Sequence, residues 1–307
     1  MKFAFIHELA EEERRKPRAE RVPVSLMCEV LAVSRQGYYA WKNRAASDRD
    51  IEDDELTETI VAMHEQHEGR LGIGRLVAEL AKAGFRHSPK RVRRLARQAG
   101  LRCVHPRPYR ATTVPAEVNP DGLIDLVGRE FVPEGPNQLW YTDITYIRVW
   151  TGWVYLASII DGFTRKIVGW SIAGHMRTSL VTDALEMAIE RQRPEIGEVI
   201  VHSDRGSQYT SHDFRALALA NGIIPSVGHT GICYDNAMVE SFNATIKKEL
   251  IHLHTWPTLK KVRNEVFHYI EVYYNRKRPH SKLGNLTPRD VEHSSTQRFD
   301  RELAAVA

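Results

Sequence analysis

Three acidic residues stand where a carboxylate could do chemistry. Asp143 lies inside a strand-forming run of aromatic and β-branched residues, where a charge is costly unless it is paired or bound. Asp204 follows the apolar run Val199–His202, and Glu240 lies about one turn into an expected helix. Three carboxylates at one place supply the oxygen ligands that Mg²⁺ prefers. Metal-dependent phosphoryl transfer is therefore the hypothesis, provided that the fold brings these residues together.

The elements that must carry these acids follow from the periodicity of the sequence. Leu139–Val149 and Trp153–Ile160 are rich in strand-forming residues and flank a Thr-Gly pair, which predicts two adjacent antiparallel strands. The pattern then gives expected strands at Arg165–Ile172 and Val199–His202 and expected helices at Ser179–Arg191, His212–Ala220, Asn236–Leu250 and Leu259–Tyr274. Strands followed by a helix and another strand predict a mixed α/β layer fold.

Two helical regions precede this part of the chain. Val24–Leu31 and Arg35–Lys42 are expected as short helices with Ser34 capping the second, which is helix-turn-helix spacing, although a plain helical hairpin fits the same pattern. The second region has expected helices at Glu55–Gln66, Arg75–Ala83 and Pro89–Gln98. The N-terminal part is therefore predicted to be all α.

Basic residues gather in the second helical region. Ten Lys or Arg residues and no Asp or Glu occur between Lys82 and Arg110. On the helix Pro89–Gln98, an inward-facing apolar row leaves a basic surface suited to phosphates, with a merely solvated face as the alternative. The residues predicted to bind DNA there are Lys90, Arg91, Arg93, Arg94 and Arg97.

The composition is that of a globular protein. Of the 307 residues, 42% are hydrophobic and 27% charged, and no apolar stretch approaches the roughly 20 residues that span a bilayer, so no membrane partner is expected. Cys28, Cys103 and Cys233 contain no close pair, which predicts a reducing cytoplasm and no Cys-x-x-Cys zinc site. His64 and His67 are accordingly expected to be surface residues.

Several stretches of sequence together identify a family. Between Asp204 and Glu240 lie 35 residues. The characteristic stretches are WYTDITY at 140–146, DGFTR at 161–165, HSDRGSQY at 202–209, DNAMVESF at 235–242 and YNRKRPHS at 274–281. In these, and over nearly its whole length, the chain resembles the second-frame (OrfB) transposases of the insertion-sequence-3 family, which carry an integrase catalytic core of the retroviral integrase superfamily.

That resemblance implies a ribonuclease H-like core, a mixed five-stranded sheet with flanking helices, preceded by helix-turn-helix regions. It implies that Asp143 on the first strand, Asp204 after the fourth and Glu240 on a late helix converge as catalytic and metal-binding residues. The implied cofactor is Mg²⁺, with Mn²⁺ able to substitute, expected as two ions. The implied activity is that of a DDE transposase, which cleaves double-stranded DNA and transfers the strand without a covalent protein–DNA intermediate.

Further residues are assigned by their positions around the acids. Lys247, seven residues after Glu240, matches a basic position of the family and is expected to reach a DNA phosphate, with a solvated lysine as the alternative. Arg205, in the loop after Asp204, is expected to position DNA, with a structural role as the alternative. The same role, with a structural role as the alternative, is considered for Ser207, Gln208, Tyr209, Asn275, Arg278 and His280. Asp161 also ends a strand, but Gly162 makes a turn-forming role the better interpretation.

Five regions are predicted. They are a helix-turn-helix-like region at 1–46, a second, basic one at 47–105, a proline-rich linker at 106–133, the catalytic core with C-terminal helices at 134–295, and a tail at 296–307. The expected partners are element-end and target DNA, further copies of the chain, and an upstream-frame helix-turn-helix protein, in the cytoplasm of a bacterium at its nucleoid. The alternatives are a DNA-binding regulatory product that needs that upstream protein, and a simple nuclease on the same fold.

Overall fold

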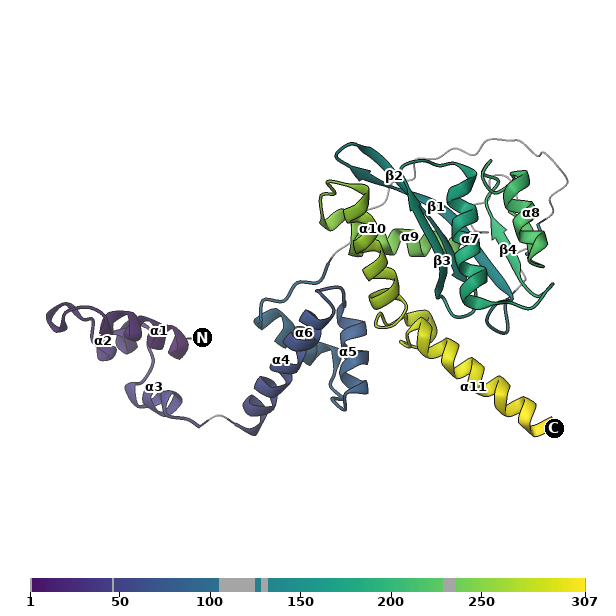
Figure 1. Cartoon of the computed structure of the whole chain (residues 1–307). Helices are drawn as coiled ribbons and strands as arrows, with labels where there is room; N and C mark the ends of the chain where they lie inside the picture. Colours follow the sequence, from purple (N-terminus) through teal and green to yellow (C-terminus); the bar gives the residue numbers. More distant parts are fainter. Residues whose placement is uncertain (1, 46, 105–124, 128–131, 229–235, 307) are drawn as a thin grey trace. The chain divides into compact units, whose positions relative to one another are not determined.

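The computed structural model describes all residues except 1, 46, 105–124, 128–131, 229–235 and 307 (Figure 1). The chain divides into two compact units, Met1–Thr59 and Ile60–Ala307. Most of the predicted linker lies outside the described residues, so it stays a prediction. Among the helices that are described, none is long and apolar enough to span a membrane.

The first unit is helical. It contains α1 (Lys2–Arg14), the 3-10 helix η1 (Arg18–Glu20), α2 (Val24–Val30), α3 (Arg35–Lys42) and the beginning of α4 (Asp48–Gln66). Its core is formed by Ile6, Ala10, Met27, Cys28 and Tyr38. Ser34 Oγ accepts a hydrogen bond of 2.9 Å from the backbone N–H of Gly37. The two short helices and the Ser34 cap are therefore confirmed, whereas the choice between a helix-turn-helix and a plain helical hairpin stays a prediction. Helix α1 was not anticipated.

The second unit begins with the end of α4 and two shorter helices, α5 (Ile73–Lys82) and α6 (Pro89–Gln98). The Ser88 hydroxyl accepts a bond of 3.3 Å from the N–H of Arg91, and Pro89 occupies the first turn, as its fixed backbone angle favours. The expected inward-facing row, Val92, Leu95 and Ala96, is buried.

A five-stranded sheet forms the centre of this unit. Its strands are β1 (Leu139–Val149), β2 (Gly152–Asp161), β3 (Ile167–Ala173), β4 (Ile200–Ser203) and β5 (Ile224–Val227). The order is β3-β2-β1-β4-β5, with β1–β2 and β2–β3 antiparallel and β1–β4 and β4–β5 parallel. This is the ribonuclease H-like mixed sheet that the resemblance implies. β4 pairs with β1 only over Leu139–Tyr141.

Helices cover both faces of the sheet (Figure 1). Their bounds are α7 (Thr178–Gln192), α8 (His212–Ala220), α9 (Ala237–Glu249), η2 (Ile251–Leu253), α10 (Leu259–Phe267), η3 (His268–Tyr274), η4 (Ser281–Leu283) and α11 (Pro288–Val306). Alternate residues of β1 enter two cores. Ile147 and Val149 pack with α9, α10 and η3, whereas Trp140 packs with α7 and α8.

Two elements differ from the sequence expectation. The predicted helix Leu259–Tyr274 has its expected bounds but not one type of winding: α10 ends at Phe267 and continues as the π-helix η3, whose wider turn lets the N–H of Asn275 donate to Ile270 O. The edge strand β5 was not found among the sequence patterns. It has only four residues and includes Pro225, which removes a ladder donor and is tolerated at a sheet edge.

Candidate active site

Asp143 lies at the middle of β1, where it is opposite Ser158 of β2. The parallel pairing with β4 stops two residues earlier, at Tyr141, so among the described residues no strand lies along this edge of β1 at Asp143. Helix α9 packs there instead. Asn243 of α9 donates a hydrogen bond of 2.8 Å from Nδ2 to Asp143 Oδ2.

Asp204 directly follows β4 and is exposed. Its Oδ1 accepts a hydrogen bond of 2.9 Å from the backbone N–H of Gly206. A Cβ at Gly206 would lie 2.9 Å from that same oxygen, so a larger residue there would push the Asp204 carboxylate out of this position. The turn holds the Asp204 carboxylate at the strand exit, as the sequence predicts.

Glu240 lies in the first turn of α9 and is exposed. The start of this helix is fixed to β1, because the Asn236 side-chain amide donates a bond of 2.9 Å to the carbonyl of Thr142. On the other side of β1, the hydroxyls of Thr142 and Tyr209 lie 3.1 Å apart and are buried. The residue before Asp143 is thus bound both to the helix of Glu240 and to the loop that follows Asp204.

The electrostatics couple the three acids. The pKa of Asp143 is raised to about 7, first by burial, then by the negative charge of Asp204 and, more weakly, by that of Glu240, while the Asn243 hydrogen bond opposes this rise. The pKa of Glu240 is also raised, first by burial and then by the charge of Asp204. Carboxylates that repel one another in this way are a donor set that a divalent cation would stabilise.

The three acids are close enough for the charge of Asp204 to raise the pKa values of Asp143 and Glu240, but their side chains do not form a set of metal ligands in this conformation. In the part of the chain that the structure describes, no group of three His, Cys, Asp or Glu side chains is arranged to hold a metal ion. The chemistry of the donor set fits a hard cation, since three carboxylates of one charged cluster come from β1, the β4 exit and α9. Ligation would require these side chains to draw closer.

Lys247 lies on α9 about two turns after Glu240. Its Nζ is 4.7 Å from the centre of the Tyr146 ring. Burial lowers the pKa of Lys247 and the charge of Asp143 acts in the opposite direction, which places this ammonium near the acids. Its role as a phosphate ligand stays a prediction.

The loop after Asp204 is held mainly by contacts within the protein. Arg205 Nε donates to the carbonyl of Gly228 at 2.8 Å, and Gln208 Nε2 donates to the carbonyl of Met176 at 3.0 Å. Tyr209 is buried and packs edge-on against Phe214, which favours the structural role given as the alternative for this side chain. Ser207 is exposed.

Asp161 has the structural role that the sequence indicated. Its Oδ1 accepts hydrogen bonds from the N–H of Phe163 and from both the N–H and hydroxyl of Thr164, and its Oδ2 accepts one of 2.8 Å from the N–H of Asn137. The carboxylate is buried and fully engaged in the turn between β2 and β3. It is not an additional metal ligand.

Asn275, Arg278 and His280 also have structural roles. Asn275 exchanges two hydrogen bonds with the backbone of Ile167 on β3. Arg278 donates from Nε and Nη2 to the carboxylate of Glu249, at 2.8 to 3.1 Å. His280 is held neutral, because burial and then the charge of Arg278 lower its pKa to about 3.

Glu249, at the end of α9, is the centre of a buried charged network that no local sequence pattern revealed. Tyr269 donates to its Oε2 at 2.8 Å, and Arg75 of α5 lies 3.7 Å from Oε1. Burial would lower the pKa of Arg278, but the hydrogen bonds and charge of Glu249 raise it above its usual value. The end of α9 is therefore fixed as firmly as its beginning.

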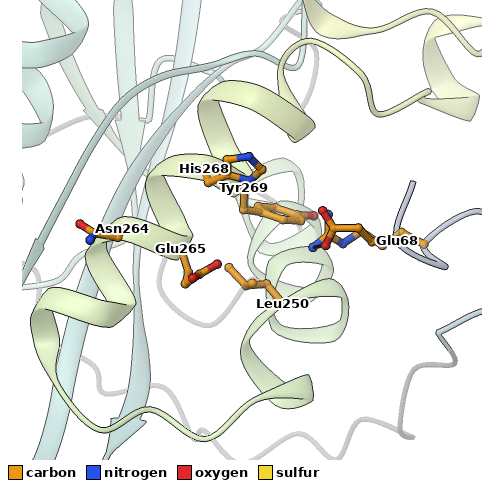
Figure 2. A pocket seen from close by; sticks show the side chains of 7 residues that line it. Glu68, Leu250, Asn264, Glu265, His268 and Tyr269 are labelled. Atoms are coloured by element: carbon orange, nitrogen blue, oxygen red, sulfur yellow. Dashed lines mark ion pairs between the residues drawn. The ribbon is translucent and has the colours of Figure 1, made fainter. Parts of the chain in front are cut away.

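His67 packs beside this charged network. His67 is buried with its ring edge-on to Tyr273 at 5.9 Å, so its prediction as a surface residue is wrong. Arg70 lies over the Tyr273 ring at 4.6 Å and donates to the backbone carbonyl of Glu249. A cavity of about 300 Å³ adjoins these groups, with Glu68 and Tyr269 among its lining residues (Figure 2).

The basic helix α6 keeps its charges on the surface. Four of the residues predicted to bind DNA are exposed, namely Lys90, Arg93, Arg94 and Arg97. Arg91 is half-buried, with Nη1 3.4 Å from His87 Nδ1. The arrangement agrees with a polyanion-binding face, and the individual contacts to DNA stay predictions.

Comparison with known proteins identifies relatives along nearly all of the chain. Residues 133–233 and 221–288 match two family models that are both described as Integrase core domain, and residues 52–109 match an HTH-like domain. Transposase InsF for insertion sequence IS3A of Escherichia coli K12 is 38% identical over 303 residues, which cover 96% of this chain and 99% of that protein.

A second relative is described as the insertion element IS600 uncharacterized 31 kDa protein of Shigella sonnei. It is 40% identical over 262 residues, covering 85% of this chain and 96% of that protein. Among solved structures, the HTLV-2 integrase catalytic core domain in complex with magnesium matches 52% of this chain and 99% of that one, at 20% identity and a TM-score of 0.41.

Proposed function

Because the chain belongs to the family of IS3 transposases, we propose that Asp143, Asp204 and Glu240 are the metal-binding catalytic acids with which it cuts and joins DNA. The activity of the family is DNA transposition by an integrase-type core. The observation that supports the residue assignment is that three acids from three separate elements influence one another: burial raises the pKa of Asp143 to about 7 together with the charges of Asp204 and, more weakly, Glu240.

The three carboxylates would hold divalent cations, which we propose to be two Mg²⁺ or Mn²⁺ ions. When bound, these ions would activate the attacking water or DNA 3′-hydroxyl and stabilise the leaving oxygen. Asn243 orients the carboxylate of Asp143, and the turn at Gly206 orients that of Asp204. Lys247, beside Asp143, would neutralise a neighbouring DNA phosphate.

DNA binding would be supported by the exposed basic face of α6. Its side chains meet the requirement for contacts that depend on phosphate charge and not on base sequence. Arg205 is proposed to contribute from the Asp204 loop. We further propose that the chain acts as a homo-oligomer at the bacterial nucleoid, together with or fused to an upstream-frame helix-turn-helix protein.

The proposal is tested by incubating labelled DNA ends of the insertion sequence with Mg²⁺ and the wild-type chain or Asp204→Asn. The wild type is expected to nick and join the DNA, and Asp204→Asn is expected to bind it with unchanged affinity but to do neither. Asp213→Asn is the matched control, because Asp213 is an exposed acid whose ion-pair neighbour is His212.

Cleavage by Asp204→Asn at the wild-type rate would refute the assignment of the acids. The wild type could bind the DNA ends but neither cut nor join them, even with the upstream protein present. That result would refute the catalytic role of this chain and support the alternative, a DNA-binding regulatory product. Cleavage without joining would identify a nuclease.

A further inference from the structure

The β1–β2 hairpin exposes large aromatic side chains next to the candidate active site. Tyr146 is 53% exposed and Trp153 is 45% exposed, and Trp150 at the hairpin turn is 74% exposed. Side chains of this size are usually mostly buried, because each removes a large apolar area from water. A group of them on one hairpin indicates a contact surface.

Two of these rings lie next to each other with a cation at either end. The Tyr146 and Trp153 rings lie 5.3 Å apart in an edge-to-face contact. Lys247 Nζ is 4.7 Å from the centre of the Tyr146 ring, and the guanidinium carbon of Arg148 is 5.1 Å from the centre of the Trp153 ring. Lys247, Tyr146, Trp153 and Arg148 therefore form a continuous aromatic–basic row.

The row begins at the candidate acids and carries only positive charge. Lys247, at one end of the row, shares α9 with Glu240, and the charge of Asp143 acts on it. No Asp or Glu occurs between Ile144 and Ile160, the part of the hairpin that carries the exposed rings. A polyanion is the complementary ligand for such a surface.

The hairpin is anchored to the core by its buried side chains and by a backbone hydrogen bond at its turn. Ile147 and Val149, which alternate with the exposed residues of β1, are buried in the core. At the turn, the N–H of Trp150 donates a bond of 3.0 Å to the carbonyl of Trp256, which is itself buried. The rings are thus supported on a rigid strand pair, which reduces the entropy lost on binding.

We propose that the aromatic–basic row binds unpaired nucleotides of the DNA strand beside the scissile phosphate, and this rests on the proposed function. Aromatic faces can stack only on bases that have left the double helix, while Lys247 and Arg148 neutralise the adjoining phosphates. A second copy of the chain is a poorer occupant, because it would place two positively charged rows against each other. The row would hold the cut end open next to the acids.

The test compares two fluorescent probes, a blunt duplex and the same duplex with a single-stranded oligothymidine extension. Anisotropy is measured with the full chain in chelator, so that no cleavage occurs. The wild type is expected to prefer the extended probe. Tyr146→Ala and Trp153→Ala should each lose roughly fivefold or more in affinity for it, with the blunt duplex unchanged.

Matched variants separate stacking from other effects. Tyr146→Phe keeps the ring and should keep the preference. Phe267→Ala, which removes a 51% exposed aromatic outside the row, should also keep it. An unchanged preference in Trp153→Ala, or an equal loss for both probes, would overturn the proposal. So would dissociation of a wild-type oligomer by both alanine variants in sedimentation, which would make the row an interface between copies.

The proposal and the catalytic function can fail separately. Asp204→Asn should keep the preference for the extended probe while losing cleavage. If the wild type prefers the extended probe but never cuts its DNA ends, the catalytic function is refuted. The proposed binding of unpaired nucleotides by the row is then still supported. A wild type that cuts but shows no preference would refute the row alone.

Discussion

Asn243 and Asp143 are joined by a 2.8 Å hydrogen bond across 100 residues of sequence, from helix α9 to strand β1. Asn243 follows Glu240 by three residues, so the bond fixes the helix of one candidate acid against the strand of another. Asn243 is itself buried, so the bond positions the Asp143 carboxylate as well as the helix.

Replacing Asn243 with Leu should impair catalysis in a pH-dependent way. The hydrogen bond lowers the pKa of Asp143, so its loss raises that pKa and less of the carboxylate is ionised near neutral pH. We expect DNA cleavage at pH 7 to fall about tenfold, as for a bond to a charged group, with partial recovery at pH 8.5. Cleavage rates across pH measure this. Asn264→Ala, at an exposed asparagine, is the control, and an unshifted pH profile in Asn243→Leu would contradict the role.

The metal-free protein should lose stability as the pH rises toward neutrality. The pKa of Asp143 is about 7 in the folded protein, above its usual 3.8, so the folded state binds the extra proton. This stabilisation is complete below pH 3.8, declines as the pH rises through 7 at up to about 1.4 kcal/mol per unit, and is absent above.

Thermal unfolding in chelator at pH 5 and pH 8 tests this dependence. Asp143→Asn should be less sensitive to pH and more stable than the wild type at pH 8. Mg²⁺ should stabilise the wild type at pH 8 more than at pH 5. Equal effects of Asp143→Asn at the two pH values would speak against a raised pKa.

Asp161→Ala should damage the fold and not the chemistry. The buried carboxylate accepts hydrogen bonds from Asn137, Phe163 and Thr164, and its removal leaves those donors unpaired. We expect a loss of about 2 kcal/mol or more in the free energy of unfolding, measured in urea, whereas exposed Asp204→Asn stays near the wild type. A stable but inactive Asp161→Ala would make Asp161 a member of the site.

Arg278→Met should be strongly destabilising because it leaves the charge of Glu249 buried without its main partner. The expected loss is about 3–5 kcal/mol in the free energy of unfolding. Adding Glu249→Gln should recover part of it. Lys261→Ala is the control, since its exposed pair with Glu265 should contribute less than about 1 kcal/mol. Similar losses in Arg278→Met and Lys261→Ala would contradict the central role of the network.

Alanine at Lys90, Arg93 or Arg97 should weaken DNA binding for all sequences. Each lost phosphate contact should reduce the slope of log affinity against log salt by about 0.9. Arg191→Ala, which removes an arginine paired with Glu271, should leave the slope unchanged. Titrations at several salt concentrations provide the measurement. An unchanged slope in the α6 variants would show that this helix faces protein and not DNA.

Local pattern was enough to predict much of the fold. β1 was predicted at its observed bounds because aromatic and β-branched residues fill it, and α6 was predicted because Ser88 caps it and Pro89 begins it. β5 escaped prediction because four residues including Pro225 carry too little pattern. The π-turn of η3 preserves the apolar spacing of a helix and so could not be distinguished from one.

The candidate site was predictable only in part. Asp143, Asp204 and Glu240 could be proposed from their positions, but the contact of Asn243 with Asp143 depends on packing between distant segments. The burial of His67 depends in the same way on Tyr273, which is far along the chain. Side-chain hydrogen bonds of such long range have no periodic signal in the sequence.

Beyond Tyr141, β1 continues without β4 beside it, and Asn236 takes the place of a neighbouring strand by donating to the Thr142 carbonyl. A bare strand edge is a template for aggregation, so α9 protects solubility as well as carrying Glu240. The helix that carries the third acid is therefore also the cover of this strand edge, so loss of its contact with β1 would affect solubility as well as activity.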